Sequence, residues 1–325
     1  MDFLHTRTVR FRTIGSAAGL LSCLALHCSS KERPGIEERD DASRNDAAAL
    51  SEAAVLPEAA VASGDADRDS EEDDAPTTHE PDANGAWTQL FNGRNLEGWD
   101  TYLGPPHEAD DAGRWHPGST PIGLNLDPER VFSVVNIDGA SAIQISGQFW
   151  GALTTIAEYE NYHLFVEYKW GSRVWPQLGS RDSGLLYHSI GAFGAVEKGG
   201  ASLAEPPGSA FFMTSMELQI AQGDVGSYYA LGPIAVDGGV FFLRATSQRE
   251  QSGKWNTIEV YTASNESLHV VNGVVVAHPR NAVHAVGGEP FARVARGKIQ
   301  LQSEAAEIYF RTVRLEHIER LPDLP

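Results

Sequence analysis

Cysteine is nearly absent from this chain of 325 residues, and its two copies lie close together near the N-terminus, at Cys23 and Cys28. Residues 83–325 contain none, which excludes disulfide bonds and thiolate metal sites from that region even in an oxidising compartment. Any domain formed there must be stabilised by its own hydrophobic core. The region is long enough to build one large core.

Basic residues are also scarce, because the chain carries a formal net charge of −19 and its pI is near 4.9. Nucleic-acid binding is therefore not expected, since it needs a basic stripe or patch. Several local motifs are missing as well. The chain has no His-x-His or His-Glu-x-x-His spacing for zinc, no Gly-x-Ser-x-Gly elbow and no phosphate-binding loop.

Residues 1–30 have the pattern of an export signal, with three arginines ahead of a short apolar run at residues 14–26. That run is too short to span a bilayer as a mature helix. Cys23 follows Leu-Leu-Ser, which resembles a lipoprotein signal-peptidase site, and Cys28 follows a poorer version. We predict lipidation at one of them, with export to the cell envelope and membrane attachment through lipid only. An ordinary cleaved signal with two incidental cysteines is the alternative.

Residues 31–82 are rich in alanine, serine and acidic residues, with 17 acids and 5 bases. A segment of this composition cannot bury enough apolar surface to offset its chain entropy. We predict a disordered acidic linker here, followed by one folded domain over residues 83–325.

Short β-like runs separated by turn residues recur from Trp87 onward, and no long helical period appears after residue 86. Asn272-Gly273 between two Val-rich runs predicts a tight hairpin. This pattern indicates an all-β domain of antiparallel strands, as a sandwich or barrel. Two long segments rich in glycine and proline, residues 101–130 and 191–208, are expected to form the rims of a groove.

The segment Arg181–His188 is the first candidate for chemistry. If it is extended, alternation places Asp182, Gly184, Leu186 and His188 on one face and Tyr187 on the other. Gly184 inside a strand predicts the close approach of a backbone or a ligand. The alternative is a strand end at which Arg181 and Asp182 only pair at the surface.

The segment Ser215–Gln222 is the second candidate, because Met216, Leu218 and Ile220 belong in a core while Glu217 and Gln219 face the other way. Sandwich glycosidases of the laminarinase type carry carboxylates at a similar spacing, but here Gln219 and Gln222 stand at two of those places. Glycoside hydrolysis by two carboxylates from this strand is therefore not expected, although another strand could supply a partner. Trp115 and Trp175, on predicted loops, are candidates for stacking on sugar rings.

Eight motifs in this order resemble the 3-keto-disaccharide hydrolase domain family: WTQLFNGRNLEGW (Trp87–Trp99), GLNLDPERVF (Gly123–Phe132), TTIAEYENYHLFVEYKWG (Thr154–Gly171), RDSGLLYH (Arg181–His188), MELQIAQGDVG (Met216–Gly226), KWN (Lys254–Asn256), VNG (Val271–Gly273) and GKIQLQSEAAEIYF (Gly297–Phe310). The resemblance implies a concanavalin-like jelly-roll sandwich of two antiparallel sheets. It also implies action on glycosides already oxidised to a ketone at C3 of the sugar.

A C3 ketone acidifies the proton on C2, so one base can begin an elimination that expels the C1 substituent, after which water adds. Glu217 or His188 could be that base, and Arg181, Gln219 or a bound metal could stabilise the developing charge. We expect the catalytic group to be Glu217, with His188 and Arg181 nearby. We expect substrate contacts from six further residues: Gln219, Gln222, Asp182, Tyr187, Trp115 and Trp175. Carbohydrate is the expected partner and no protein partner is implied. No cofactor is assigned, and participation of a divalent metal is left open.

The chain departs from the pattern of its relatives at two acids, because Gln222 replaces a glutamate and Ser227 an aspartate, while Asp224 keeps the acid between them. If either lost acid binds a metal or acts as a base, activity is weakened or lost. A hydrolase or lyase is favoured, and a non-catalytic carbohydrate-binding module on the cell envelope is the alternative.

Overall fold

The computed structural model describes residues 87–197, 202–206, 208–284 and 292–323. Every regular element in these ranges is a β-strand. Among the described residues there is no helix with the length and hydropathy that a transmembrane segment needs. The expected signal, both cysteines and the linker lie outside the described residues, so those predictions stay predictions.

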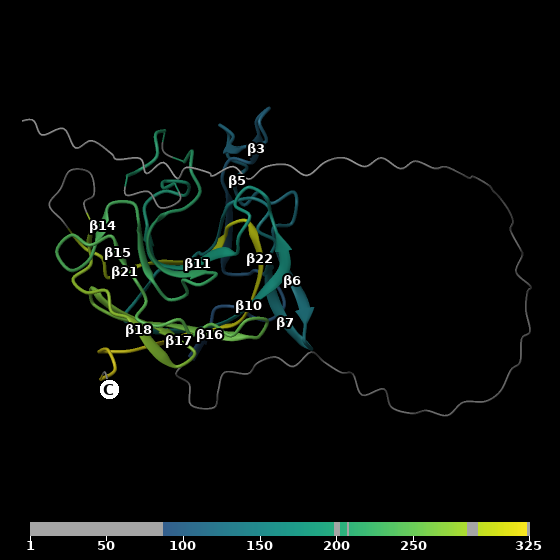
Figure 1. The fold of residues 1–325 in the computed structure, drawn as a ribbon. Helices are drawn as coiled ribbons and strands as arrows, with labels where there is room; N and C mark the ends of the chain where they lie inside the picture. Colours follow the sequence, from purple (N-terminus) through teal and green to yellow (C-terminus); the bar gives the residue numbers. More distant parts are fainter. Residues whose placement is uncertain (1–86, 198–201, 207, 285–291, 324–325) are drawn as a thin grey trace, which may run out of the picture. The chain divides into compact units, whose positions relative to one another are not determined.

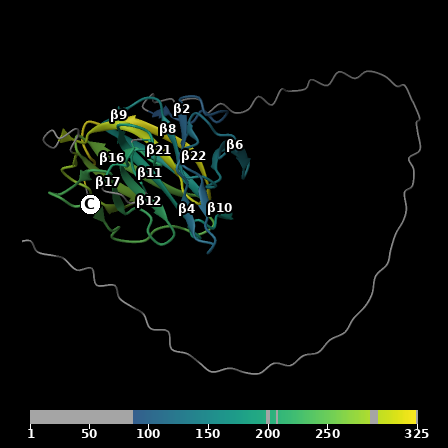
Figure 2. The same cartoon turned by 90° about the horizontal axis from the view of Figure 1, so that it is seen from above.

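One antiparallel sheet has nine strands in the order β15-β13-β12-β11-β21-β8-β2-β5, with β9 pairing on β21. Figure 2 shows β12, β11, β21, β8 and β2 following one another across the molecule. The strands of this sheet are β2 (Trp99–Leu103), β5 (Gly123–Leu124), β8 (Gly151–Thr155), β9 (Tyr159–Glu160), β11 (Asp182–Ile190), β12 (Thr214–Ala221), β13 (Tyr228–Leu231), β15 (Phe242–Leu243) and β21 (Arg296–Ser303).

The other large antiparallel sheet has eight strands in the order β18-β17-β16-β10-β22-β7-β6, with β1 pairing on β22. Its strands are β1 (Trp87–Gln89), β6 (Phe132–Ile137), β7 (Ala140–Ile145), β10 (Tyr162–Val174), β16 (Asn256–Ala263), β17 (Glu266–Val271), β18 (Val274–Ala277) and β22 (Ala306–His317). The predicted hairpin joins β17 to β18, with Val271 paired to Val274 and positive φ angles at Asn272 and Gly273. Positive φ at both turn residues is the geometry that Asn-Gly favours.

Five short strands form two small additional sheets. They are β3 (His107–Ala109) with β4 (Trp115–Pro117), and β14 (Ile234–Ala235) with β19 (Val283–His284) and β20 (Ala292–Arg293). The segment 101–130, expected to be irregular, therefore contains β3, β4 and β5 as well as most of β2. Residues 191–197, 202–206 and 208–213 form no named strand, which agrees with the expected loop.

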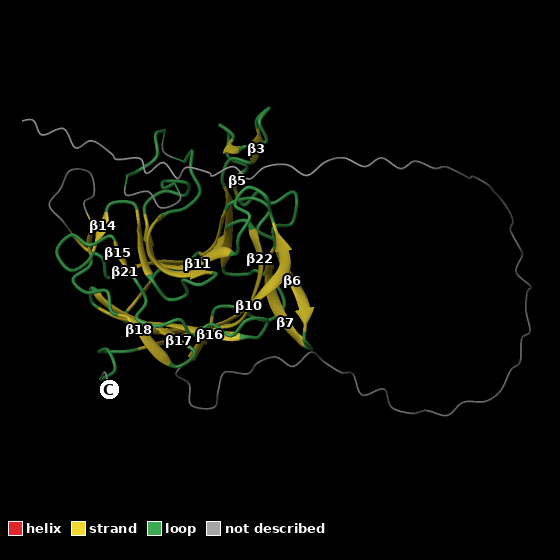
Figure 3. Cartoon of the chain, in the orientation of Figure 1, coloured by secondary structure: helices red, strands yellow, loops and turns green. Residues whose placement is uncertain are grey.

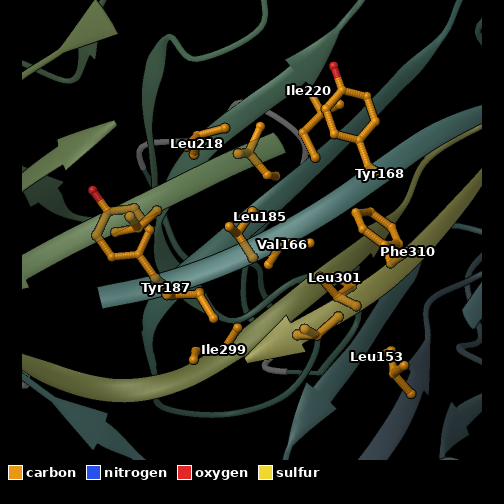
Figure 4. Packing of buried hydrophobic residues seen from close by; sticks show 14 of the residues in the cluster. Leu153, Val166, Tyr168, Leu185, Tyr187, Leu218, Ile220, Ile299, Leu301 and Phe310 are labelled. Atoms are coloured by element: carbon orange, nitrogen blue, oxygen red, sulfur yellow. The ribbon is translucent and has the colours of Figure 1, made fainter. Parts of the chain in front are cut away.

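The two large sheets pack face to face around one hydrophobic core. Leu153, Leu185, Leu218 and Leu301 enter it from the nine-stranded sheet, and Phe310 enters it from the eight-stranded sheet. Figure 4 shows these side chains meeting between the sheets. Because successive strand residues point to opposite faces, this packing assigns one face of each strand to the core. The predicted all-β jelly-roll sandwich of two antiparallel sheets is confirmed.

The nine-stranded sheet lies above β16, β17 and β18 in Figure 1, and its strand β11 is curved. Figure 3 shows that the concave side of β11 faces away from the eight-stranded sheet, towards the loops that rise above it. This second face of the nine-stranded sheet, which we call the site face, carries every other residue of each strand. Its polar side chains are the candidates for function.

Candidate functional site

The site face brings together residues that are far apart in the sequence. Leu186 of β11 lies between Glu217 of β12 and Gln300 of β21, and Glu217 is paired in turn with Tyr229 of β13. Their neighbours along the strands, such as Leu185 and Leu218, are in the core. The prediction that Glu217 turns away from the aliphatic core is therefore confirmed.

Glu217 lies over a glycine that makes room for it. The side chain of Glu217 is buried, with 5% of its residue surface exposed. A Cβ atom at position 184 would collide with the carboxylate of Glu217 and would come within 2.8 Å of Oε1 of Gln302. A close approach at Gly184 is thus present, but the approaching groups are this carboxylate and this carboxamide rather than the expected backbone or ligand.

The phenol of Tyr229 lies beside Glu217 and Asp224. Its hydroxyl donates to Oδ2 of Asp224 at 3.0 Å. Burial raises the pKa of Tyr229 to about 12, with further contributions from the hydrogen bond to Asp224 and from the negative charges of Asp224, Glu217 and Asp182. Tyr229 therefore stays protonated at neutral pH, and its single proton is donated to Asp224.

Three polar residues of β21 and the turn after it also belong to this group. Gln300 and Gln302 are 1% and 2% exposed. Glu304 is also 2% exposed, and its backbone forms an antiparallel β-bridge with that of Asp182. Oε1 of Gln302 accepts no hydrogen bond from the described residues. The sequence signal was available, since these polar residues alternate with the apolar Ile299 and Leu301.

A second apolar cluster covers the site face on the side of β8. Leu186, Trp150, Phe211 and Phe212 belong to it. The ring of His107 lies over Phe211, at 5.5 Å between centroids and 11° between planes, and contacts Trp150 at 4.3 Å. Burial lowers the pKa of His107. His107 comes from the first expected rim segment, and Ala195 and Val196 of the second belong to the same cluster. The described parts of both segments therefore contribute to an apolar wall beside the polar group.

The two tryptophans expected to stack on sugars lie in different surroundings. Trp175 is partly buried against the second apolar cluster, and its indole donates to the carbonyl of Ser146 at 2.8 Å. Trp115 lies on β4 of the small hairpin and is 39% exposed. Neither residue has a described contact with Glu217.

His188 is not on the site face, which corrects the alternation predicted for its strand. The pairing of β11 with both neighbours shifts register after Leu186 and Tyr187, and His188 has a positive φ of 49°. This bulge turns the imidazole between the sheets, where Nε2 contacts Oγ1 of Thr262 at 2.9 Å. Burial lowers the pKa of His188 to about 3. The expected position of His188 beside Glu217 is wrong.

Tyr187 and Arg181 are also directed away from the site face. The hydroxyl of Tyr187 contacts Oγ of Ser267 at 2.8 Å and Nε2 of His269 at 2.9 Å, and its ring lies in the core of Figure 4. Arg181 donates to the carbonyl of Gly171 at 3.3 Å, on the strand β10 of the opposite sheet. This geometry therefore supports neither the expected contact of Tyr187 with substrate nor the expected catalytic position of Arg181 near Glu217.

Gln219 and Asp182 lie on the same face of the sheet as Gly184, as alternation predicts. Gln219 is paired with Gly184, and its Oε1 accepts the backbone amide of Ile220 at 3.0 Å. Asp182 is buried, at 8% exposure, near enough to Tyr229 for its charge to raise the phenol pKa. Gln222, in contrast, is exposed on the turn after β12.

Ser227, at the place where relatives carry an aspartate, is fully buried. Its hydroxyl donates to Oδ1 of Asp224 at 2.5 Å and accepts the backbone amide of Ala245 at 2.9 Å. Asp224 is therefore held by two hydroxyls, from Ser227 and Tyr229. Within the described part of the chain, no group of three or more His, Cys, Asp or Glu side chains is arranged to hold a metal ion.

Taken as chemistry, the site face offers a carboxylate with carboxamides and a protonated phenol around it. Such a set can remove a proton from carbon and hydrogen-bond to an oxygen that gains negative charge. The carboxylate and amide groups are also the side chains that bind sugar hydroxyls.

Among curated proteins, none matches this sequence. Solved structures that resemble the chain include a candidate glycosyl hydrolase from Parabacteroides distasonis, 18% identical over 72% of this chain and 95% of the other, with a TM-score of 0.42. A carbohydrate binding module from Bacillus subtilis is 8% identical over 57% and 91%, with a TM-score of 0.36. A β-glucanase from Bacillus licheniformis is 10% identical over 73% and 100%, with a TM-score of 0.38. At these identities and scores the likenesses carry no functional information.

A family model described as the 3-keto-alpha-glucoside-1,2-lyase-like domain matches residues 86–316. The match covers all eight motifs on which the resemblance was based, and it spans most of the chain. The resemblance is therefore confirmed: the chain belongs to the 3-keto-alpha-glucoside-1,2-lyase-like domain family.

Proposed function

We propose that this domain cleaves 3-keto-glycosides and that Glu217 removes the proton at C2 of the oxidised sugar. The position of Glu217 is the observation that supports this proposal most. Its carboxylate lies on the site face over Gly184, next to the carboxamide of Gln302 and across from the phenol of Tyr229. The family description, a 1,2-lyase-like domain, names the same two carbon atoms of a keto-glucoside.

The proposed reaction proceeds by elimination and hydration. The C3 carbonyl withdraws electrons from the C2–H bond, so Glu217 takes that proton and an enolate forms at C2 and C3. The electron pair then returns to form a double bond between C1 and C2 while the C1–O bond breaks, and the departing oxygen takes a proton from water. Addition of water across this double bond completes a net hydrolysis. One carboxylate is sufficient as base for this sequence.

Hydrogen-bond donors around Glu217 support the charged intermediate. The carboxamide of Gln302 is buried beside Glu217 and carries two N–H donors. Donors placed where an oxyanion develops lower the barrier without rearranging during the reaction. We assign the carboxamide N–H of Gln302 to the C3 oxygen. The departing oxygen takes its proton from water, because the Tyr229 hydroxyl already donates to Asp224.

The test uses the full chain and a nitrophenyl 3-keto-glucoside, whose cleavage releases a coloured phenol. Glu217→Gln is expected to lower kcat by about 10²–10⁴-fold, which is the usual contribution of a positioned base. Glu129→Gln, at an exposed acid, is the matched control and is expected to keep wild-type turnover. A Glu217→Gln protein with more than about a third of wild-type turnover would remove Glu217 from the mechanism.

The second candidate function is a carbohydrate-binding module without catalysis. Gln222 and Ser227 in place of two acids favour it, since Gln222 lies exposed and the Ser227 hydroxyl is taken up by Asp224. Wild-type protein that binds unoxidised disaccharides but turns over no 3-keto-glycoside would support the module. Turnover by the wild type would exclude it.

We also propose that the protein is exported and lipid-anchored, with residues 31–82 as a spacer between membrane and domain. The arginines and apolar run before Cys23 and Cys28 support this proposal. Lipid labelling of the wild type in a bacterial host is expected, with loss of the label when both cysteines are changed to serine. Label that persists in the double variant would contradict it.

A further inference from the structure

An aromatic pair lies beside Glu217 at the edge of the site face. Register places Glu217 opposite Tyr229, and Tyr229 opposite Phe242 on the edge strand β15. Residues paired in this way project from the same face of the sheet. The rings of Tyr229 and Phe242 contact each other, at 4.6 Å between centroids and 44° between planes.

Phe242 is unusual in being both aromatic and open to solvent, with 40% of its surface exposed. A single exposed apolar residue needs no explanation, but Phe242 is continuous with Tyr229 and, through it, with the acid. The hydrogen bond from the Tyr229 hydroxyl to Asp224 fixes that ring in place. A fixed ring and an open ring together form an apolar platform beside a polar site.

The platform lies on one side of Glu217, and the second apolar cluster lies on the other. Leu186 of that cluster separates Glu217 from Gln300 and is completely buried. Towards β15, in contrast, Tyr229 is half-buried and Phe242 is exposed. The side towards β15 is therefore the more open of the two sides of Glu217.

The spacing suits a second sugar ring. Adjacent strands lie about 4.8 Å apart, so Phe242, two strands from Glu217, is about 10 Å away across the sheet. A ring linked through C1 of a sugar whose C2 contacts Glu217 lies over the platform at that separation. Pyranose rings present apolar C–H faces, which pack on aromatic rings, while their hydroxyls stay hydrated at the edge.

We propose that Phe242, with Tyr229, binds the second ring of a disaccharide substrate and so makes the domain selective for 3-keto-disaccharides over simple 3-keto-glycosides. This inference rests on the proposed function, because it takes the oxidised ring to lie at Glu217. Phe242 does not reach the reacting atoms, so its part is in substrate selection.

The test compares Phe242→Ala with the wild type on a 3-keto-disaccharide and on a methyl 3-keto-glucoside. We expect KM for the disaccharide to rise about tenfold, as loss of one aromatic contact does, with kcat/KM for the methyl glycoside unchanged within about twofold. Phe242→Trp is expected to restore the disaccharide KM. Equal effects on both substrates, or no effect on either, would overturn the proposal.

Phe241→Ala is the matched control, since Phe241 is also exposed and directly precedes β15, so alternation directs its side chain to the opposite side from Phe242. It is expected to leave both substrates unaffected. If the wild type turns over no 3-keto-glycoside, the proposed function fails. Whether Phe242 and Tyr229 bind a sugar ring is then tested separately, by calorimetric binding of the unoxidised disaccharide. Binding that weakens about tenfold in Phe242→Ala alone would support the platform, and binding that is absent from the wild type or indifferent to the change would refute it.

Discussion

Acidification is expected to destabilise this domain through two histidines buried between its sheets. Burial lowers the pKa of His188 to about 3 and that of His269 to about 4, the latter against a partly opposing hydrogen bond to the carbonyl of Gly226. In the unfolded chain both have an ordinary pKa near 6.5. The unfolded state therefore binds more protons below pH 6.5, so stability is complete above that pH and falls as the pH drops towards the folded values.

The size of the loss follows from these values. Between pH 7.5 and pH 5, an unfolded histidine gains almost a full proton while the folded one stays neutral, which costs about 2 kcal/mol for each residue and about 4 kcal/mol for the pair. The folded pKa values hardly enter this sum, because both lie at or below about 4. A domain of ordinary stability, about 5–15 kcal/mol, would lose a large part of it.

Urea unfolding followed by tryptophan fluorescence at pH 7.5, 6 and 5 measures this loss. His188→Asn suits the comparison, because asparagine tolerates the positive φ at this position. Whatever its stability at pH 7.5, the variant is expected to lose about 2 kcal/mol less than the wild type on acidification. His317→Asn, at an exposed histidine, is expected to keep the full loss. A His188→Asn protein with the wild-type loss would refute the burial of a neutral His188.

Three further changes probe the site face and the core. Gly184→Ala introduces a Cβ against the carboxylate of Glu217, so kcat/KM is expected to fall about 10²-fold in nitrophenol release, and a fall of less than about threefold would show that Glu217 need not lie over position 184. Ser227→Ala removes the hydroxyl that joins Asp224 to a buried backbone amide and is expected to lower the free energy of unfolding by about 1–3 kcal/mol in urea titration, where an unchanged midpoint would contradict the bonding. Tyr187→Phe is expected to lower the free energy of unfolding by about 1–3 kcal/mol and to leave turnover unchanged, because its hydroxyl bonds groups between the sheets. A rise in KM without loss of stability would show instead that Tyr187 contacts substrate.

Much of the sandwich could be predicted from alternation, but two central strands could not. Strand β8 contains only buried residues, because its core face meets the sandwich interior and its other face meets the second apolar cluster. A strand covered on both sides has no polar alternation to reveal it. Strand β2 was hidden for a related reason, since it continues into the segment rich in glycine and proline after Thr101.

Part of the candidate site could likewise be predicted from alternation, and part could not. Glu217 and Gly184 were predictable because β12 and the first part of β11 are regular, so alternation fixes their faces. His188 was not predictable, since the bulge after Leu186 reverses the remaining faces and residues 185–190 contain no glycine or proline that would mark the change. Phe242 depends on pairing between β13 and β15, which a local pattern does not specify.

Proton exchange at C2 tests the central proposal most directly. A 3-keto-glucoside is incubated with the protein in deuterium oxide, and loss of its C2 proton signal is followed by NMR. Wild-type protein is expected to accelerate exchange or elimination at C2, and Glu217→Gln is expected to reduce that acceleration by about 10²-fold or more. Exchange at the wild-type rate in Glu217→Gln would contradict the account, because another group would then be the base.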